Sequence, residues 1–286
     1  MTTAYLNNEF IPLEEARISP MDRGFLFGDG IYEVIPSHGG RFVGLKLHLA
    51  RLQRGLDEIQ LELPVSYDEL TTLMKTLVER NGSGSLGIYI QVTRGVSMTR
   101  NHVYPSDVTP TLFIYTFDIG KPNEGDPDTA RLWRVVTGRD LRWQRCQIKS
   151  TSLLGNVMHM MEGVDAGAEE ILLFDEHDNL TEASVSNAFV VSGNTIATPA
   201  LDQHKLAGVT RDMALSILSD HGDFNVEVRP VSRTEVGAAD ELWLSSSTKE
   251  LAPIVSIDGK PVGTGAAGSV WCRAQRLMAA HRFDDY

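Results

Sequence analysis

The sequence predicts a mixed α/β fold with two domains, and three patterns support this prediction. Apolar and polar residues alternate from Leu86 to Val92, which predicts a half-buried strand. Apolar residues recur at helical spacing from Leu45 to Ile59, which predicts an amphipathic helix. A cluster of proline, glycine and acidic residues over 118–128 matches neither pattern and is typical of a linker between domains.

We therefore expect a small N-terminal α/β domain over residues 1–118, a linker over 119–130 and a larger C-terminal domain over 131–286. In the N-terminal domain, Ser66 and Glu69 have capping-box spacing and should begin a helix that ends near Gly82. A further strand is predicted over 111–117.

The C-terminal domain has mainly strand patterns, with helical patterns between them. Strands are predicted over 131–136, 171–174, 185–191, 225–231, 241–244 and 254–257, and helices over 152–166, 211–219 and 266–280.

The composition limits the possible functions. The 286 residues include 42% hydrophobic and 22% charged residues, as in ordinary globular proteins, so a disordered chain is excluded. A formal net charge of −12 argues against general binding to nucleic acid or to anionic membranes. Two cysteines suit a reducing compartment, and no signal peptide or membrane-length apolar run is found, so we expect a cytoplasmic protein. The eight histidines are scattered and predict no metal site.

Lys149 is the first candidate for chemistry. It lies between a predicted strand and a predicted helix. A single lysine is usually a solvated surface residue. However, Arg142 and Arg145 lie close by in the sequence, and an amine beside cations has a lowered pKa. Such an amine is a nucleophile that can form a Schiff base with a carbonyl compound.

Three further segments could take part in the same chemistry. Glu182 is either a solvated carboxylate at a strand edge or one that keeps a ring nitrogen protonated. Gly208, Val209 and Thr210 lie at the start of a predicted helix, where free N–H groups can bind a phosphate. The hydroxyl run 245–248 follows a strand and is either a solvated loop or a source of phosphate ligands.

The order of these segments along the chain resembles the class IV aminotransferases, the fold-type-IV pyridoxal phosphate enzymes. The resemblance covers nearly the whole chain and includes the blocks 22–24, 27–33, 142–150, 181–187 and 247–250. It implies a small N-terminal α/β domain, a larger, β-barrel-like C-terminal domain that carries the lysine, and pyridoxal 5′-phosphate as cofactor.

The resemblance also implies roles for single residues. Lys149 is similar to the Schiff-base lysine, which also moves the proton between the substrate Cα and the cofactor C4′. Glu182 matches the partner of the pyridine nitrogen, and Arg51 matches the phosphate-binding arginine. The remaining cofactor-binding residues implied are Gly208, Val209, Thr210, Ser247 and Thr248.

Arg100 and His102 lie on the loop that follows the strand at 86–92. Basic loops of this kind are common at hairpin ends. The Arg-x-His pattern nevertheless resembles D-amino acid aminotransferases, in which this pair and a tyrosine, matched here by Tyr32, bind the substrate α-carboxylate. In those relatives the neighbouring subunit contributes the loop, which implies a homodimer with shared active sites.

The implied reaction is a ping-pong transfer of the amino group from a D-amino acid, such as D-alanine, to a 2-oxo acid, such as 2-oxoglutarate. Other activities of the same family are alternatives: transamination of branched-chain L-amino acids, transamination of (R)-amines, and aminodeoxychorismate lyase chemistry. An alternative of a different class is a protein that binds the cofactor without turnover.

Overall fold

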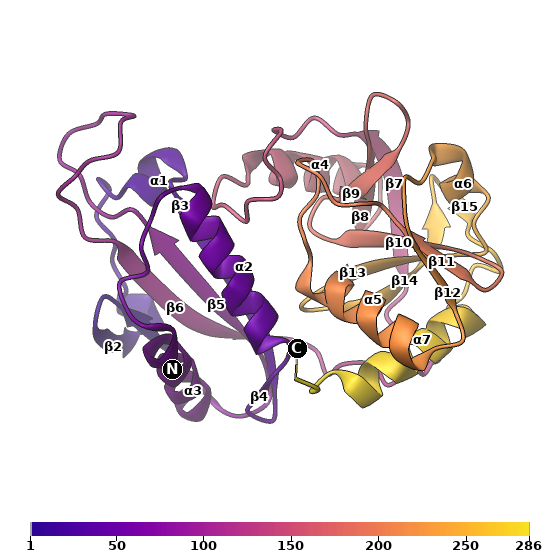
Figure 1. Ribbon diagram of the computed structural model, residues 1–286, viewed down its shortest axis with the longest axis horizontal. Coiled ribbons are helices and arrows are strands. Elements are labelled where there is room, and N and C mark those ends of the chain that lie inside the picture. The colour runs from indigo at the N-terminus through magenta and orange to yellow at the C-terminus, as the bar shows by residue number, and fades with distance from the viewer. Residues whose placement is uncertain (1, 286) are drawn as a thin grey trace. The chain divides into compact units, whose positions relative to one another are not determined.

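The computed structural model describes residues 2–285, which form two compact units (Figure 1). The first unit contains the chain up to Lys121, the short segment Ile148–Leu153 and Asp285, and the second contains Pro122–Gln147 and Leu154–Asp284. The segment that carries Lys149 is therefore packed with the first unit, although the chain on both sides of it belongs to the second.

The first unit is built on a six-stranded sheet in the order β2-β1-β6-β5-β3-β4, with antiparallel pairing throughout. Its strands are β1 (Thr3–Leu6), β2 (Glu9–Pro12), β3 (Gly30–His38), β4 (Arg41–Phe42), β5 (Ser85–Thr93) and β6 (Thr111–Asp118). Its helices are the 3-10 turn η1 (Leu13–Glu15), α1 (Arg23–Phe27), α2 (Leu45–Glu58) and α3 (Tyr67–Asn81).

Alternation along β3 and β5 gives this sheet two different faces. Inward residues such as Ile31 and Ile88 pack with Leu52 of α2 in a core that is closed to solvent. On the opposite face, Tyr32 stacks on Tyr89 with ring centroids 5.6 Å apart. The sheet thus presents aromatic rings on the face that does not pack against α2.

The second unit is built on a nine-stranded sheet in the order β12-β11-β10-β13-β14-β7-β8-β9, with β15 added beside β14. Its strands are β7 (Trp133–Arg139), β8 (Glu170–Phe174), β9 (Leu180–Ala183), β10 (Asn187–Ser192), β11 (Thr195–Thr198), β12 (Asn225–Val228), β13 (Glu241–Ser246), β14 (Glu250–Ile257) and β15 (Lys260–Pro261). Its helices are α4 (Leu154–Asp165), α5 (Val209–His221), α6 (Arg233–Gly237) and α7 (Ser269–His281).

This sheet is curled, because β9 at one end of the hydrogen-bonded order also contacts β10 near the other end. The mixed α/β class and the barrel-like C-terminal sheet are therefore confirmed. No helix within residues 2–285 is both long and apolar enough to cross a membrane.

The strongest sequence patterns correspond to the longest elements. The capping-box helix is α3, and the Ser66 hydroxyl accepts a hydrogen bond from the Glu69 N–H at 3.2 Å. The strand predicted over 185–191 begins only at Asn187, and the four-residue strand β9 was not predicted. All four residues of β9 are buried, so they lack the alternation by which a half-exposed strand is found.

Candidate functional site

The candidate site residues fall in both units, and each set is described within its own unit. The first unit holds Tyr32, Arg51, Arg100, His102 and Lys149, and the second holds Glu182, Gly208, Val209, Thr210, Ser247 and Thr248.

Lys149 lies on a short segment that runs beside β3. The Tyr32 N–H donates to the Lys149 carbonyl, and the Thr151 N–H donates to the Gly30 carbonyl, both at 3.0 Å. These bonds fix the backbone on both sides of the lysine. Its Nζ lies 4.2 Å from the centre of the Tyr32 ring, a distance at which an ammonium group is attracted to an aromatic face. The structure thus brings Lys149 and Tyr32 together.

Arg51 forms a buried ion pair with Glu33, the residue after Tyr32 on β3. Its Nε donates to Glu33 Oε1 at 2.7 Å and its Nη2 donates to Oε2 at 2.8 Å. His48, one turn earlier on α2, lies with its Nδ1 2.8 Å from the same Oε2. The three side chains are 6% exposed or less. The two-point pairing holds the Arg51 guanidinium in one orientation.

The charges of this cluster balance. Burial alone would raise the pKa of Glu33, but Arg51 and His48 outweigh it and hold that pKa well below its usual range. Burial lowers the pKa of His48 despite the carboxylate beside it, so the imidazole is neutral at pH 7 and donates to Glu33 from Nδ1. Sequence reasoning assigned no role to Glu33. The available signal was an acidic residue at an inward position of β3, between Ile31 and Ile35.

Arg100 and His102 are exposed and lie against the same aromatic ring. The Arg100 guanidinium carbon is 5.1 Å from the centre of the Phe27 ring, and the His102 ring centre is 5.2 Å from it. Arg23 holds the backbone of their loop, because its Nη1 donates to the Asn101 carbonyl at 2.5 Å and its Nη2 to the His102 carbonyl at 3.4 Å.

Arg23 is itself fixed by Asp29, which also binds Arg94. The Arg23 Nε lies 2.7 Å from Asp29 Oδ2, and Arg94 donates to both oxygens of Asp29 at 2.9 and 3.0 Å. The Arg94 guanidinium also lies 3.6 Å from the centre of the Tyr104 ring, at the far end of the loop. The loop that carries Arg100 and His102 is therefore anchored at two points by buried arginines.

Glu182 lies on β9 and is 5% exposed. Its Oε1 accepts a hydrogen bond from Arg142 Nη1 at 2.6 Å. Its Oε2 accepts two more, from Asn187 Nδ2 at 3.0 Å and from the Leu206 N–H at 3.1 Å. These three donors come from three separate segments of the second unit and fix the carboxylate in place.

The Glu182 cluster contains two carboxylates and one hydrogen-bonded guanidinium. Arg142 also donates to both oxygens of Asp140, at 3.0 and 2.7 Å, so two carboxylates share one guanidinium. Burial raises the pKa of Glu182 to about 6, although Arg142 opposes this. Burial also raises the pKa of Cys146 to about 11, so this thiol adds no charge at pH 7. Arg142, one of the two arginines expected to act on Lys149, is thus paired with Asp140 and Glu182.

Helix α5 supplies an anion site next to this cluster. Its N-cap is Gly208, which gives no side-chain cap to the amides of Val209 and Thr210. A Cβ on Gly208 would lie 1.9 Å from Asn187 Oδ1, so only glycine fits beside the residue that binds Glu182. The first-turn N–H groups can therefore bind an anion.

The hydroxyl run ends β13 and continues into the following turn. Ser247 is half-buried and Thr248 is exposed. Among the residues that the structure describes, the buried hydroxyls of Ser245 and Ser246 have no hydrogen-bond partner. A buried hydroxyl without a partner is costly. Successive side chains of a strand point to opposite faces, so only Ser245, which lies opposite Asn187 in the β10–β13 pairing, is a further candidate for a phosphate ligand on that face. Sequence reasoning noted the run but selected only its last two members.

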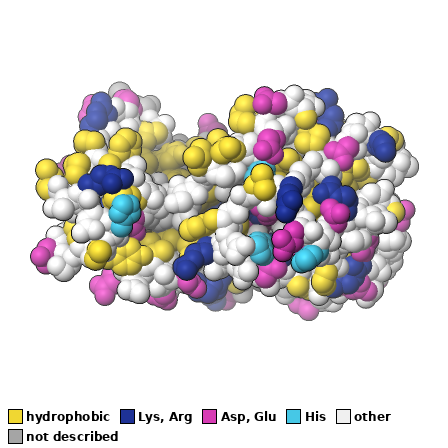
Figure 2. Space-filling view, turned by 90° about the horizontal axis from the view of Figure 1, so that it is seen from above, with side chains coloured by type: hydrophobic (Ala, Val, Ile, Leu, Met, Phe, Trp, Pro, Cys, Tyr) yellow, Lys and Arg dark blue, Asp and Glu magenta, His cyan; other side chains and the backbone are white. Residues whose placement is uncertain are grey.

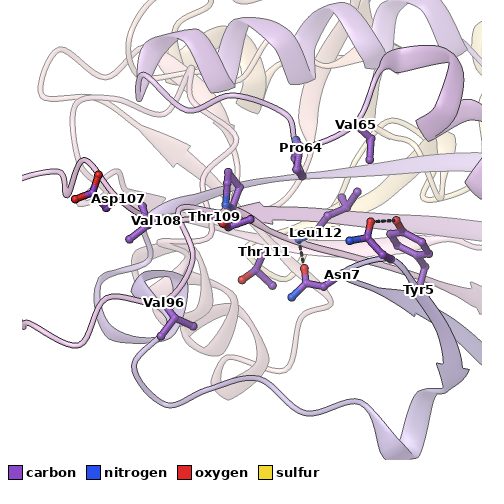
Figure 3. A pocket seen from close by; sticks show the side chains of 12 residues that line it. Tyr5, Asn7, Pro64, Val65, Val96, Asp107, Val108, Thr109, Thr111 and Leu112 are labelled. Carbon is purple, nitrogen blue, oxygen red and sulfur yellow. Dashed lines mark hydrogen bonds between the residues drawn. The ribbon is translucent and has the colours of Figure 1, made fainter.

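A cavity of about 530 Å³ in the first unit contains none of these residues (Figure 3). Its wall includes Tyr5, Val65 and Leu112, and Asn7 Oδ1 on the same wall accepts a hydrogen bond from the Leu112 N–H at 3.0 Å. Its lining offers one carboxylate, Asp107, and no lysine, arginine or histidine. The cavity therefore lacks the cationic groups that a phosphate or an α-carboxylate requires.

Comparison with known proteins identifies the family. The pattern of the amino-transferase class IV family matches residues 30–257. The chain is 38% identical to a D-alanine aminotransferase of Bacillus licheniformis over 95% of this chain and 94% of that protein. It is 34% identical to a D-alanine aminotransferase of Listeria monocytogenes serotype 4b over 96% and 93% of the two chains.

A solved structure gives the same result. A branched-chain amino acid aminotransferase of T.th., in complex with pyridoxamine 5′-phosphate, aligns with a TM-score of 0.89 at 25% identity, over 98% of this chain and 94% of that one. The family pattern, the curated relatives and the fold agree: the chain belongs to the class IV aminotransferases.

Proposed function

We propose that this chain is a pyridoxal phosphate-dependent transaminase that moves the amino group of a D-amino acid to a 2-oxo acid. Two relatives with 38% and 34% identity over most of their length are D-alanine aminotransferases. The observation that carries the proposal is the Glu182 cluster, in which two buried carboxylates share one arginine. A protonated ring nitrogen would supply the missing positive charge.

The described residues fit the cofactor. Glu182 is a fixed carboxylate for the ring nitrogen, and hydrogen bonds from the Leu206 N–H and from Asn187 Nδ2 hold it in place. The amides of Val209 and Thr210 suit a phosphate group. When bound, pyridoxal phosphate withdraws electrons from the substrate α-carbon through its ring.

Further residues would complete the phosphate site. We assign the hydroxyls of Ser247 and Thr248 to it, and the unpartnered hydroxyl of Ser245, which lies opposite Asn187, is an additional donor. Arg51 would add a positive charge whose orientation is set by Glu33. A dianion bound by backbone amides, hydroxyls and a guanidinium is well compensated.

The protein side of the reaction is proton movement and orientation. Lys149 Nζ would hold the cofactor until the substrate amine displaces it. The freed amine would then move the proton from the substrate Cα to the cofactor C4′. Tyr32 limits where this amine can lie, because the amine is attracted to one face of the Tyr32 ring. Glu182 would hold the proton on the ring nitrogen while negative charge develops in the transition state.

Arg100, His102 and Tyr32 would bind the substrate α-carboxylate. A guanidinium can bind a carboxylate through two parallel hydrogen bonds, and a phenol can add a third. Arg100 and His102 are exposed in the single chain, which is in keeping with a loop that acts in a neighbouring subunit.

The first experiment tests the cofactor and the substrate together. The absorption spectrum of the purified protein is recorded before and after adding D-alanine, L-leucine or an (R)-amine in separate samples. We expect D-alanine alone to remove the visible band of the bound cofactor, and we expect Lys149→Ala to show neither this band nor turnover. A response to L-leucine alone would favour the branched-chain alternative, the activity named for the solved T.th. enzyme.

A second experiment tests the carboxylate trap. Arg100→Ala should lower kcat/KM for D-alanine by about 10- to 150-fold, the loss expected for a charge-assisted hydrogen bond of about 1.5–3 kcal/mol. The rate with an amine that has no carboxylate should stay the same. Met98→Ala, in the same loop and 81% exposed, is the matched control. Equal losses with both substrates would rule out the trap.

We also propose a homodimer. Helix α4 carries a stripe of exposed apolar residues at helical spacing: Leu154, Val157, Met158, Met161 and Val164. Hydrophobic side chains also gather at several places on the face drawn in Figure 2. A contiguous apolar stripe on a helix marks a protein interface. In a dimer, Arg100 and His102 would act in the active site of the second copy.

Sedimentation velocity tests this assembly. Met158→Glu should shift the protein toward the monomer and lower its activity, since shared sites require both chains. Ile18→Glu, a charge placed on an exposed apolar residue of the first unit, is the control and should stay dimeric. A dimer that tolerates Met158→Glu would exclude α4 from the interface.

The two free thiols, Cys146 and Cys272, suit the cytoplasm, where we place the protein.

A further inference from the structure

Two histidines and an aspartate meet at the ends of two helices in the second unit. His221 is the last residue of α5 and His281 is the last residue of α7. Their rings stack with centroids 3.8 Å apart and planes 7° apart, and His281 Nδ1 lies 2.7 Å from Asp284 Oδ2. One donor atom from each of the three residues lies within 4.8 Å of the others.

We propose that His221, His281 and Asp284 form a site for a divalent transition metal such as Zn²⁺, with water completing the coordination. Two imidazoles and a carboxylate are the ligands that Zn²⁺ takes in proteins, whereas Mg²⁺ and Ca²⁺ prefer oxygen ligands alone.

The position of the cluster favours a cation. Both histidines lie at helix C-termini, where the helix dipoles place partial negative charge. The next cation along the chain, Arg282, is buried and pairs with Glu250 and Glu124 at 2.8 Å each, so its charge is compensated. Asp284 adds a full negative charge to the site.

Metal binding requires a small rearrangement. The lone pairs of stacked rings lie in parallel planes, so one ring must turn about its Cβ–Cγ bond before both nitrogens reach one ion. His221 is exposed and has room to turn.

The ion would be structural and would join α5 to α7. Helix α5 has 13 residues, so His221 lies about 20 Å from the proposed phosphate site at the other end of that helix. The site is thus independent of the proposed transaminase reaction.

Zinc titration of the tag-free holoenzyme by calorimetry tests the proposal, after treatment with a chelator and dialysis. We expect one Zn²⁺ per chain for the wild type and for His177→Ala, which removes an exposed histidine outside the proposed site. His221→Ala and His281→Ala should each lose this site, and Asp284→Asn should bind at least about 10-fold more weakly.

A second measurement guards against variants that fold poorly. Zn²⁺ should raise the Tm of the wild type and of His177→Ala by a few degrees, should leave the Tm of His281→Ala unchanged, and EDTA should reverse the rise. Equal zinc binding by the wild type and His281→Ala, or no binding by the wild type, would overturn the proposal. Neither readout depends on turnover, so this result is separate from that for the proposed function.

Discussion

Glu33 and Glu182 are buried carboxylates that each pair with one arginine, yet their pKa values shift in opposite directions. Glu33 is 1% exposed and its pKa is held well below the usual range. Glu182 is 5% exposed and its pKa is raised to about 6. Burial raises the pKa in both cases, so burial does not account for the difference.

The difference lies in how many carboxylates share the arginine. Arg51 donates two hydrogen bonds to Glu33, and the neutral His48 adds a third donor. Arg142 divides its donors between Glu182 and Asp140. The Glu33 cluster is therefore neutral and complete, while the Glu182 cluster keeps a net negative charge. The Glu33 pairing fixes the orientation of the Arg51 guanidinium, and a cluster with an uncompensated charge is suited to bind a cationic group.

The largest expected effect is a loss of activity on substitution of Glu182. Glu182→Gln should lower kcat by at least about 100-fold, because an amide cannot hold a proton on the cofactor ring as a carboxylate does. The cofactor should remain bound but with a shifted absorption maximum. Glu176→Gln, an exposed carboxylate in the same unit, is the control. Activity within a few-fold of the wild type would contradict the role assigned to Glu182.

The second prediction compares the two carboxylates by stability, and here the larger effect is expected for Glu33. Glu33→Gln removes the carboxylate that pairs with the buried Arg51 guanidinium, and it should lower the free energy of unfolding by about 3–5 kcal/mol. Glu182→Gln should cost much less, because its cluster already lacks a positive charge. Urea unfolding of the two variants in parallel measures the difference. Equal losses would show that the Glu182 carboxylate stabilises the fold as much as the Glu33 carboxylate does.

The pH dependence of stability sharpens the comparison further. The pKa of Glu182 is raised from 4.5 to about 6, so the folded apoenzyme binds this proton more tightly than the unfolded chain does. The tighter binding contributes about 2 kcal/mol to the free energy of unfolding. This contribution is present below pH 4.5 and is lost as the pH rises through 6. The pKa of Glu33 is lowered, so its contribution is present above pH 4.5 and lost as the pH falls toward its folded pKa.

Urea unfolding of the apoenzyme between pH 4.5 and 7.5 measures the first of these. As the pH rises, the free energy of unfolding of the wild type should fall relative to that of Glu182→Gln. A difference that stays constant over this range would show that Glu182 does not titrate there.

The smallest expected effect tests a secondary cause of the raised pKa of Glu182: burial is the largest cause, and the Asp140 carboxylate adds to it. Asp140→Asn removes the second carboxylate and leaves Arg142 to Glu182 alone. The pKa of Glu182 should then fall from about 6 toward its ordinary value of 4.5. Carbon-13 NMR of glutamate-labelled apoenzyme follows this titration, with Asp178→Asn, a surface carboxylate of the same unit, as the control. An unchanged pKa would show that burial alone sets it.

The sequence determined the parts of this protein that depend on local spacing. The apolar repeat of α2, the alternation of β5 and the Ser66 cap of α3 each follow from contacts between residues a few positions apart. Periodicity alone is enough to show which face of such an element is buried. The order of Lys149, Glu182 and the segment 208–210 along the chain was enough to indicate the family.

The tertiary structure alone decided which charges are shared. Glu33 meets Arg51 because β3 packs against α2, and Arg142 reaches Glu182 because β9 joins the curled sheet of the second unit. The same holds for His221 and His281, which lie far apart in the sequence. Electrostatic coupling of buried groups depends on separations of a few ångströms, and such separations are fixed by how elements pack, not by spacing along the chain.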